Sequence, residues 1–343
     1  MILAIETVVL VINFNGLKHL QECLASLKNQ TYQKTKILVV DDGSTDASLN
    51  FIQTNFPAME ILALKTNCGF AKAVNDSINY ALDKYQPTYL AILNNDTKVD
   101  QDWLKNLIRA IEIEENIVAV ASNMLFYNHP NLINSQGSKF TFSGQGLDIN
   151  FQKKISEVKI FPKYVLASCW GATLLRSETL NKIGLLDENY YAYLEDLDWG
   201  YRANLLGYKI IFEPKALVFH KGSAFWENYQ FKKIYLCERN SLYTIIKNYE
   251  LKNIIKVLPL VILNYFIFYP GGYLLNRKIE SYRLVPLFKE AYPLLKRLKF
   301  SLIPLRAIFW NLKHLPRSLR LRKKIQTTRT TPDQEIFPLS NQL

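Results

Sequence analysis

The chain has 343 residues, of which 49% are hydrophobic and 13% aromatic, so it can bury a large core and has the composition of a globular protein. Its four cysteines are scattered without a CxxC or CxxH pair, which argues against a structural zinc site or a disulfide scaffold and favours a reducing compartment. The net charge of +12 is concentrated, because residues 276–324 hold 14 Lys and Arg against only Glu280 and Glu290.

Strands and helices alternate along the first third of the chain. Helical spacing or a polar turn follows each apolar run, and the first run is broken by Glu6 and Asn13, as expected for a buried strand and not for a signal peptide. Short loops between alternating elements predict a mostly parallel sheet flanked by helices, in an α/β fold. The predicted strands are Thr7–Ile12, Lys36–Val40, Glu60–Leu64, Tyr89–Leu93 and Ile117–Ala121.

Polar clusters follow four of these strands at the carboxyl ends, where parallel sheets bind ligands. The clusters are Asn13–Asn15, Asp41–Asp46, Asn67–Gly69 and Asn94–Asp96. One such cluster is typical of a simple turn, whereas four on one edge predict a ligand site. The chain lacks both GxGxxG after the first strand and GxxxxGK[ST], which disfavours dinucleotide and P-loop sites.

Two stretches follow the predicted sheet. Ser122–Lys163 is polar and Gly-rich in part, so we expect loops with a hairpin. Ala167–Leu175 is apolar, with Trp170 and Gly171 at its middle. The tryptophan fits core packing and a pocket wall equally well.

Residues 190–223 crowd acidic groups around a predicted helix. Glu195, Asp196 and Asp198 stand where helical spacing begins, and carboxylates at a helix start suit its dipole. Nearby aromatics can raise a carboxylate pKa toward that of a working base. Gly207 is expected to end the helix, followed by two short strands, KIIFEP and ALVFH, the second ending at His220. For any one of these residues alone, a structural role is the commoner explanation.

The C-terminal third is predicted to be helical and basic. A helix is expected at Asn228–Lys247. Val257–Leu275 has about the length of a membrane span, but its prolines and glycines favour an interfacial or core helix pair. The basic segment 276–324, interleaved with aromatics, predicts contact with an anionic membrane surface. No motif supports nucleic-acid binding. Residues 327–343 are expected to be disordered.

Seven motifs in order, VINFNG, VVDDGSTD, NCGFAKAVN, LNNDT, CWGATLLR, YLEDLDWGYRANLLGYKI and PKALVFHKGS, resemble a known family. It comprises inverting, nucleotide-sugar-dependent glycosyltransferases of the GT-A fold that build bacterial surface polysaccharides, and the likeness is greatest to rhamnosyltransferase-like members. It spans Thr7–Tyr249. We therefore expect a GT-A domain at 1–250, a helical, basic, membrane-associating region at 251–326 and the tail beyond it.

The resemblance implies roles for individual residues. Asp196 matches the catalytic base. Asp96 and His220 match ligands of Mg²⁺ or Mn²⁺, while Asn94 stands where the family has a first carboxylate. The donor-binding residues would be Asn13, Asn15, Asp41, Asp42, Asn67, Gly69, Asn95 and Asp96. The acceptor or pocket residues would be Trp170, Gly171, Glu195, Asp198 and Arg202, with an i,i+4 ion pair as the alternative for Arg202.

The expected function is transfer of a sugar from dTDP-rhamnose or a UDP-hexose, with inversion, to a polyprenyl-diphosphate-linked or growing glycan. The expected location is peripheral, on the cytoplasmic side of the plasma membrane, and a homo-oligomer is left open. A sugar nucleotidyltransferase is an alternative, although such an enzyme should carry a Gly-rich basic loop after its first strand. A non-catalytic membrane-surface scaffold with a degenerate site is another, because of Asn94.

Overall fold

The computed structural model describes residues 5–141, 145–222, 230–274 and 301–341. Contacts divide the chain into two compact units. The first comprises Met1–Lys139, Leu147–Ala224 and Thr330–Leu343, and the second comprises Phe140–Gly146 and Phe225–Arg329. The predicted boundary at residue 250 therefore falls inside the second unit.

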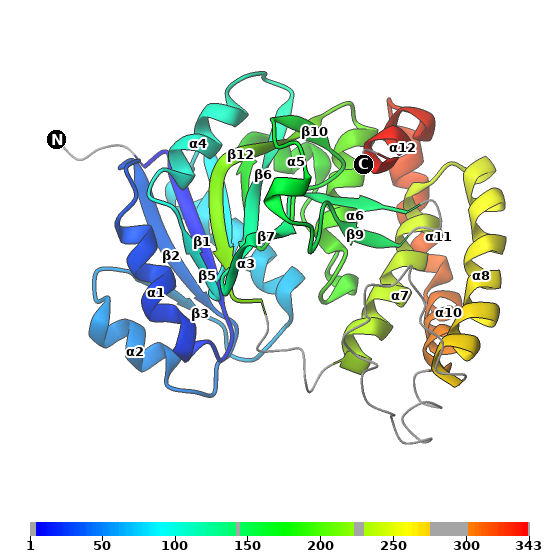
Figure 1. Cartoon of the computed structure of the whole chain (residues 1–343), viewed down its shortest axis with the longest axis horizontal. Helices are drawn as coiled ribbons and strands as arrows, with labels where there is room; N and C mark the ends of the chain where they lie inside the picture. The colour runs from blue at the N-terminus through cyan, green and yellow to red at the C-terminus, as the bar shows by residue number, and fades with distance from the viewer. Residues whose placement is uncertain (1–4, 142–144, 223–229, 275–300, 342–343) are drawn as a thin grey trace. The chain divides into compact units, whose positions relative to one another are not determined.

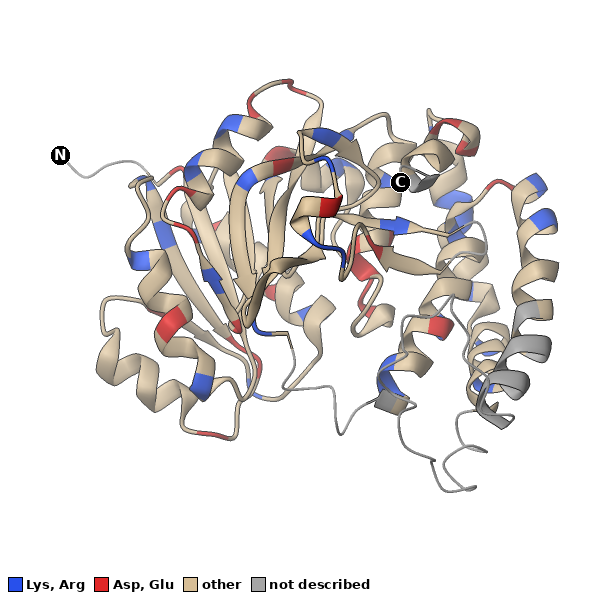
Figure 2. Ribbon diagram, in the orientation of Figure 1, with Lys and Arg blue, Asp and Glu red and all other residues tan. Residues whose placement is uncertain are grey.

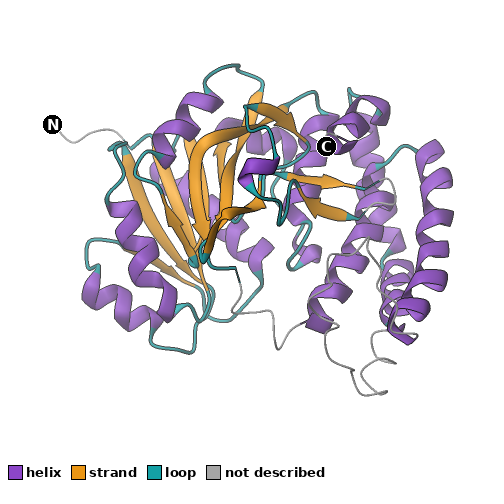
Figure 3. Cartoon of the chain, in the orientation of Figure 1, coloured by secondary structure: helices purple, strands orange, loops and turns teal. Residues whose placement is uncertain are grey.

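Figures 1 and 3 show an α/β unit followed by helices. The strands are β1 (Thr7–Asn13), β2 (Thr35–Asp41), β3 (Glu60–Ala63), β4 (Tyr89–Asn94), β5 (Thr97–Val99), β6 (Ile117–Phe126), β7 (His129–Ser135), β8 (Ser138–Phe140), β9 (Gly146–Asp148), β10 (Lys163–Val165), β11 (Ala172–Arg176) and β12 (Lys209–His220). The α-helices are α1 (Leu17–Lys28), α2 (Ser48–Asn55), α3 (Phe70–Tyr85), α4 (Trp103–Ile111), α5 (Leu180–Ile183), α6 (Glu195–Leu205), α7 (Gln230–Asn248), α8 (Leu251–Leu274), α10 (Ile303–Lys313), α11 (Leu315–Thr328) and α12 (Asp333–Asn341).

The main sheet of the first unit has the order β10-β12-β6-β11-β4-β1-β2-β3, with β5 and β7 paired beside it. The strands β4, β1, β2 and β3 are parallel neighbours, as the sequence predicted. The sheet as a whole is mixed and not mostly parallel, because β11 runs antiparallel to both β4 and β6 and β10 runs antiparallel to β12. The antiparallel strand β11 is formed by the apolar stretch around Trp170, for which the sequence predicted neither a helix nor a strand.

Both faces of the sheet are covered by helices. Val9 and Val11 of β1 pack with buried residues of α1, α2 and α4. Val8, Leu10 and Ile12 pack with residues of α3, α5 and α6 on the opposite face. Alternate residues of a strand point to opposite faces, so a strand covered on both sides must be apolar throughout, which explains the continuous apolar run.

Two local predictions differ from the structure. KIIFEP and ALVFH form one strand, β12, whose pairing with β6 shifts between Glu213 and Leu217. A shift of this kind bends a strand without ending it. The proline at 214 lies at this bend, and in the sequence it suggested that one strand ended and another began. The described part of the stretch Val257–Leu275, which ends at Leu274, lies in one helix, α8, and not in a helix pair. Among the residues that the structure describes, no helix is both long and apolar enough to cross a bilayer.

The last residues form helix α12 where disorder was expected. The segment returns to α6, because the backbone N–H groups of Thr330 and Thr331 donate to the carbonyl of Leu205. Tyr201 of α6 donates to Asp333 at 3.0 Å, and both side chains are fully buried. A polar tail becomes ordered here because its donors and acceptors find partners at the end of α6.

In the second unit α7 is the central helix, and α8, α10 and α11 pack against it. Asn311 of α10 donates to the carbonyl of Arg239 on α7, and Tyr265 of α8 donates to the carbonyl of Glu238. The helices α8 and α10 therefore meet α7 at the same turn. The basic segment 276–324 is described only from residue 301 onward, so the prediction for its first half lies outside the described residues.

Candidate active site

Three neighbouring strands bring polar side chains together at their carboxyl ends. Asn13 at the end of β1 donates to Asp41 at the end of β2, at 2.7 Å. Asn95, directly after β4, donates to Asn13 at 2.6 Å. Asp41 also accepts the backbone N–H of Ser44 at 2.8 Å. The structure thus assembles three of the predicted donor-binding residues into one hydrogen-bonded row across the strand ends.

Asn15 organises the turn beside this row. Its backbone is left-handed, with φ of 49°, a conformation that asparagine tolerates better than most residues. Its side-chain oxygen accepts the backbone N–H groups of Thr45 and Asp46, at 2.8 and 3.2 Å. Its own N–H donates to Ser44 Oγ at 2.9 Å. Asn15 therefore joins the loop after β1 to the loop after β2.

Asp42 holds the third loop of the edge. Its carboxylate is 3% exposed and accepts the backbone N–H groups of Cys68 and Gly69, at 2.8 and 3.2 Å, and the amide of Asn67 at 2.9 Å. Such a set of donors satisfies the oxygens of a buried carboxylate. The buried carboxylate of Asp42 therefore fixes the turn that carries Asn67 and Gly69.

Tyr191 links this turn to the segment that precedes α6. Its hydroxyl donates to Asn67 Oδ1 at 2.9 Å, and its carbonyl accepts the N–H of Ala71. Gly69 has φ of 89°, and a Cβ there would lie 2.6 Å from the tyrosine ring. Only glycine fits at this position, both for its conformation and for its space.

Asp96 and His220 lie together, as the resemblance implied. His220 Nε2 is 3.2 Å from Asp96 Oδ1, because β12 pairs with β5 just after the Asn94–Asp96 turn. His220 Nδ1 is 2.9 Å from the side-chain oxygen of Asn134 on β7. If a cation took the place of the hydrogen on Nε2, the ring would donate to that oxygen through Nδ1 and would turn the lone pair of Nε2 toward the ion. Histidines that bind metals commonly have this arrangement.

The donor set of this pair fits a divalent cation. One carboxylate and one imidazole nitrogen are accepted by Mn²⁺, and Mg²⁺ is often held by one or two carboxylates together with substrate phosphates. Burial opposes ionisation of Asp96, but the hydrogen bond and charge of His220 outweigh it and hold the pKa below its usual value. Across the described part of the chain, no group of three or more His, Cys, Asp or Glu is arranged to hold a metal alone. A cation here would depend on oxygens of the donor.

Asp196 is the accessible carboxylate at the start of α6. It is partly exposed, and it accepts the backbone N–H groups of Trp170 and Leu197, at 3.2 and 2.7 Å. Burial, reinforced by the charge of Asp148, raises its pKa to about 6 despite these hydrogen bonds. A carboxylate with such a pKa is mostly ionised at neutral pH and can accept a proton more readily than an ordinary aspartate.

Glu195 is buried beside it. Its side chain is 5% exposed, and its Oε2 has no hydrogen-bond partner. Burial first, and then the charges of Asp196 and Asp198, raise its pKa well above the usual value. A buried carboxyl without a donor favours the neutral form. Glu195 is therefore placed to influence the ionisation of Asp196 and not to meet a substrate.

Asp198 and Arg202 form a buried clamp. They make the predicted i,i+4 ion pair at 3.0 Å, but the aspartate is fully buried and the arginine side chain only 11% exposed. Arg202 also donates to the carbonyls of Ile183 and Leu185. The pair fastens α6 to the chain after α5, so the structure gives it a positioning role and supports neither a surface ion pair nor an open pocket contact.

Trp170 and Gly171 connect α6 to the strand ends. The indole is 1% exposed and packs edge-on against Trp199 at 5.3 Å, which resolves the two explanations in favour of core packing. Its backbone N–H holds Asp196, while the carbonyl of Gly171 accepts the N–H of Asn94 at 2.9 Å. A continuous set of contacts therefore runs from Asp196 to the strand ends that carry Asn95 and Asp96.

The sequence missed three members of the site. Asn134 orients His220, Asp148 acts on Asp196 through its charge, and Tyr191 joins the donor loop to the approach to α6. The first two lie in the stretch expected to be loops, where no periodic pattern marked them. Tyr191 gave a weak signal, because it follows Tyr190 in an aromatic run beside the acidic cluster.

Known proteins resemble this chain in sequence and in fold. The family model described as glycosyl transferase family 2 matches residues 8–179, about half of the chain. Glycosyltransferase GlyA of Streptococcus pneumoniae is 28% identical over 219 residues, which cover 60% of this chain and 29% of that protein. An uncharacterized glycosyltransferase of Haemophilus influenzae is 28% identical over 117 residues, 33% of this chain. The chain thus spans about a third of the length of these two relatives, 35% and 29%.

A third relative is covered more fully. The N-acetylglucosaminyl-diphospho-decaprenol L-rhamnosyltransferase of Mycobacterium tuberculosis is 24% identical over 238 residues, which cover 62% of this chain and 75% of that protein. Among solved structures, the mannosyltransferase PcManGT of Pyrobaculum calidifontis, in complex with GDP-Man and Mn²⁺, has a TM-score of 0.54 at 14% identity. It matches 90% of this chain and 87% of its own. This structural likeness concerns the fold.

Proposed function

Because the chain belongs to glycosyl transferase family 2, we propose that it moves one sugar from a nucleotide-sugar donor, with inversion, onto a lipid-linked or growing glycan in surface polysaccharide synthesis. The observation that carries this proposal is the position of Asp196. It is the accessible carboxylate of its cluster, its pKa is raised to about 6, and backbone contacts tie it to the strand ends that hold Asp96.

The chemistry assigns each group a task. Asp196 removes the proton of the acceptor hydroxyl while the hydroxyl oxygen forms a bond to the anomeric carbon. The bond from that carbon to the diphosphate breaks in the same step. Attack opposite the leaving group inverts the anomeric centre. A bound Mg²⁺ or Mn²⁺ would neutralise the charge that develops on the diphosphate. Asp96 and His220 are the residues that would hold the ion.

The donor edge would bind the nucleotide. The row formed by Asn13, Asp41 and Asn95 presents amide and carboxylate groups at the strand ends, and the turn at Asn67 and Gly69 brings backbone N–H groups beside it. Similarity to an L-rhamnosyltransferase favours dTDP-rhamnose, with UDP-hexoses next. The name of that relative also favours a polyprenyl-diphosphate-linked glycan as acceptor, and hence work at the cytoplasmic face of the plasma membrane.

A donor panel tests the proposal. The purified protein is incubated with nucleotide sugars and Mn²⁺, with and without a lipid-linked acceptor, and the products are identified by mass spectrometry. We expect nucleoside diphosphate and a product with one added sugar of inverted configuration. Chelation should abolish the reaction and Mn²⁺ should restore it. Release of pyrophosphate would instead indicate a nucleotidyltransferase, and absence of turnover with every donor would indicate a non-catalytic scaffold.

A further inference from the structure

In the described part of the chain, helices α8 and α10 each have a buried stripe and an exposed face that is largely apolar. In α8 the buried stripe is Val257, Val261 and Tyr265, at intervals of four residues. In α10 it is Ile303, Ala307 and Asn311, with the same spacing. The remaining face of an ordinary surface helix is polar, whereas a helix that is apolar all round is normally covered by something.

The uncovered faces consist of large apolar side chains. Ten of the 14 large hydrophobic residues exposed in the described chain belong to the second unit. On α8 the exposed fractions lie between 37% and 65%, for Leu251, Ile255, Leu260, Ile262 and Leu263. Beside and on α10 they lie between 46% and 71%, for Leu302, Leu305, Phe309 and Leu312. Soluble proteins rarely expose so many together without a binding role.

Basic side chains accompany these faces. Residues 301–329 contain eight Lys and Arg and no Asp or Glu. Those of α10 and α11 that are exposed are Arg306, Lys313, Arg317, Arg320, Lys323 and Lys324. Figure 2 shows this concentration of positive charge along α11, with further lysines at the start of α8. The partner that covers the apolar faces should therefore be anionic.

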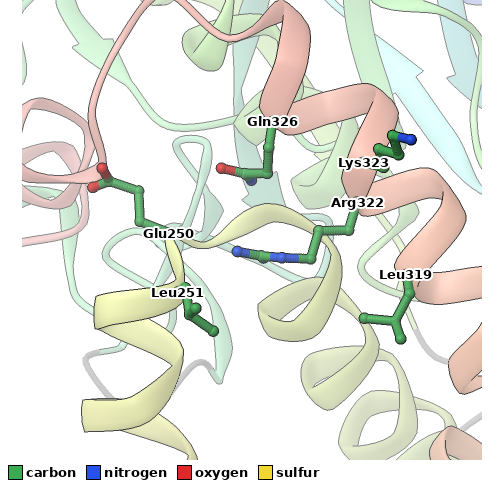
Figure 4. A pocket seen from close by; sticks show the side chains of 6 residues that line it. All are labelled: Glu250, Leu251, Leu319, Arg322, Lys323 and Gln326. Carbon is green, nitrogen blue, oxygen red and sulfur yellow. The ribbon is translucent and has the colours of Figure 1, made fainter.

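One cavity is lined by both apolar and basic side chains of the second unit. It has a volume of about 480 Å³ and lies between α11 and the turn that connects α7 to α8 (Figure 4). Leu251 and Leu319 line it together with Arg322 and Lys323, and Glu250 and Gln326 complete the lining. Arg322 is held there by the carbonyls of Ile246 and Tyr249. Apolar and cationic groups thus meet at one place, as they do at a lipid headgroup boundary.

We propose that the exposed faces of α8 and α10, with the basic side chains of α10 and α11, dock the protein on an anionic phospholipid bilayer. The apolar side chains enter the headgroup region, and the lysines and arginines contact lipid phosphates. A second copy of this chain fits less well, because a symmetric contact through this surface would bring like charges together. The inference deepens the proposed function, on which it rests for the lipid-linked acceptor, by assigning the surface that holds the enzyme at that lipid.

The test measures co-sedimentation of the full chain with phosphatidylcholine vesicles, with and without phosphatidylglycerol. Binding should require the anionic lipid and weaken with salt. Arg320→Gln/Lys323→Gln/Lys324→Gln should weaken binding on the order of 100-fold at low salt, at roughly fivefold per charge near the surface. The control Lys28→Gln/Lys159→Gln/Lys182→Gln removes the same charge from exposed positions of the first unit and should change binding little.

Apolar substitutions separate insertion from charge. Phe309→Gln/Leu312→Gln should weaken binding by about tenfold or more, even at low salt, because two side chains no longer leave water. The control Ile113→Gln/Phe161→Gln changes equally exposed residues of the first unit and should have no effect. Circular dichroism and melting temperature confirm that each variant is folded.

The outcomes are distinct. Equal binding to neutral and anionic vesicles, or a control set that weakens binding as much as its matched test variant, overturns the inference. Concentration-dependent dimers that Phe309→Gln/Leu312→Gln abolishes, without vesicle binding, assign the surface to a second copy and also overturn it. Nucleoside diphosphate release from free donor is measured on the same variants and should stay unchanged. Vesicle binding without turnover of any donor would contradict the proposed function while leaving this inference intact.

Discussion

Carboxylates have opposite surroundings at the donor-binding ends of the strands and at the start of α6. At the edge, the buried carboxylate of Asp42 is surrounded by backbone and side-chain donors. At α6, Glu195 has an oxygen without a partner, and the pKa of Asp196 is raised to about 6. Donors fix the loop beside the first carboxylate, whereas burial and the charge of Asp148 raise the pKa of Asp196. The first region positions a loop, and the second holds the carboxylate that we propose as the base.

The largest effect should come from Asp196, the carboxylate that we propose as the base. Asp196→Asn keeps the shape and one of the two backbone contacts but cannot accept the proton, so turnover should fall by about 10²–10⁴-fold while donor binding persists. Product formation and a thermal shift with donor measure the two properties. Glu115→Gln, an exposed acid away from the site, is the control. Near-normal turnover of Asp196→Asn would assign the base to another residue and would contradict the difference between the two regions.

The orientation of His220 should matter next. Asn134→Ala removes the oxygen that receives the proton of Nδ1, so the ring loses its fixed direction. We expect roughly 10- to 100-fold weaker Mn²⁺ activation, as is typical for such supporting contacts. Activity is titrated against Mn²⁺, and Asn134→Asp should restore part of the response because it keeps an acceptor. An unchanged Mn²⁺ titration for Asn134→Ala would remove Asn134 from the site.

A stability measurement sharpens the contrast between the two carboxylates. Asp42→Asn places an amide among donors and should lower the free energy of unfolding by about 2 kcal/mol, since several hydrogen bonds to a buried charge are lost. Asp196→Asn should not lower it at pH 7, because the folded state there holds a carboxylate whose ionisation is unfavourable. Urea unfolding compares the two variants. Equal losses of unfolding free energy in the two variants would show that hydrogen-bond donors do not account for the difference between Asp42 and Asp196.

The smallest effect expected is the dependence on pH. The pKa of Asp196 is raised from 3.8 to about 6, so the base is ionised above this value and protonated below it. Catalytic efficiency should fall by about tenfold per unit as pH drops below about 6. The same shift makes the contribution of this group to stability decrease as pH rises from about 4 to about 6. An acid limb near pH 4 would indicate an unshifted carboxylate.

Much of the donor edge could be predicted from the order of residues alone. Apolar runs buried on two faces define β1, β2 and β4 in register, so the polar groups after them must share an edge. Asp96 and His220 were paired only through the family resemblance, because 124 positions in the sequence separate them. The charge of residues 276–324 was visible directly in the sequence.

Only the tertiary structure decided which acidic residue is accessible, because Glu195, Asp196 and Asp198 are adjacent and chemically alike in sequence. Burial of Glu195 and the clamp from Arg202 to Asp198 leave Asp196 as the partly exposed member of the three, and both depend on how α6 packs. The antiparallel β11, the return of α12 and the support of His220 by Asn134 likewise arise from long-range contacts. Local patterns fix periodicity and capping, but a contact between distant residues is set by the packing of the whole unit.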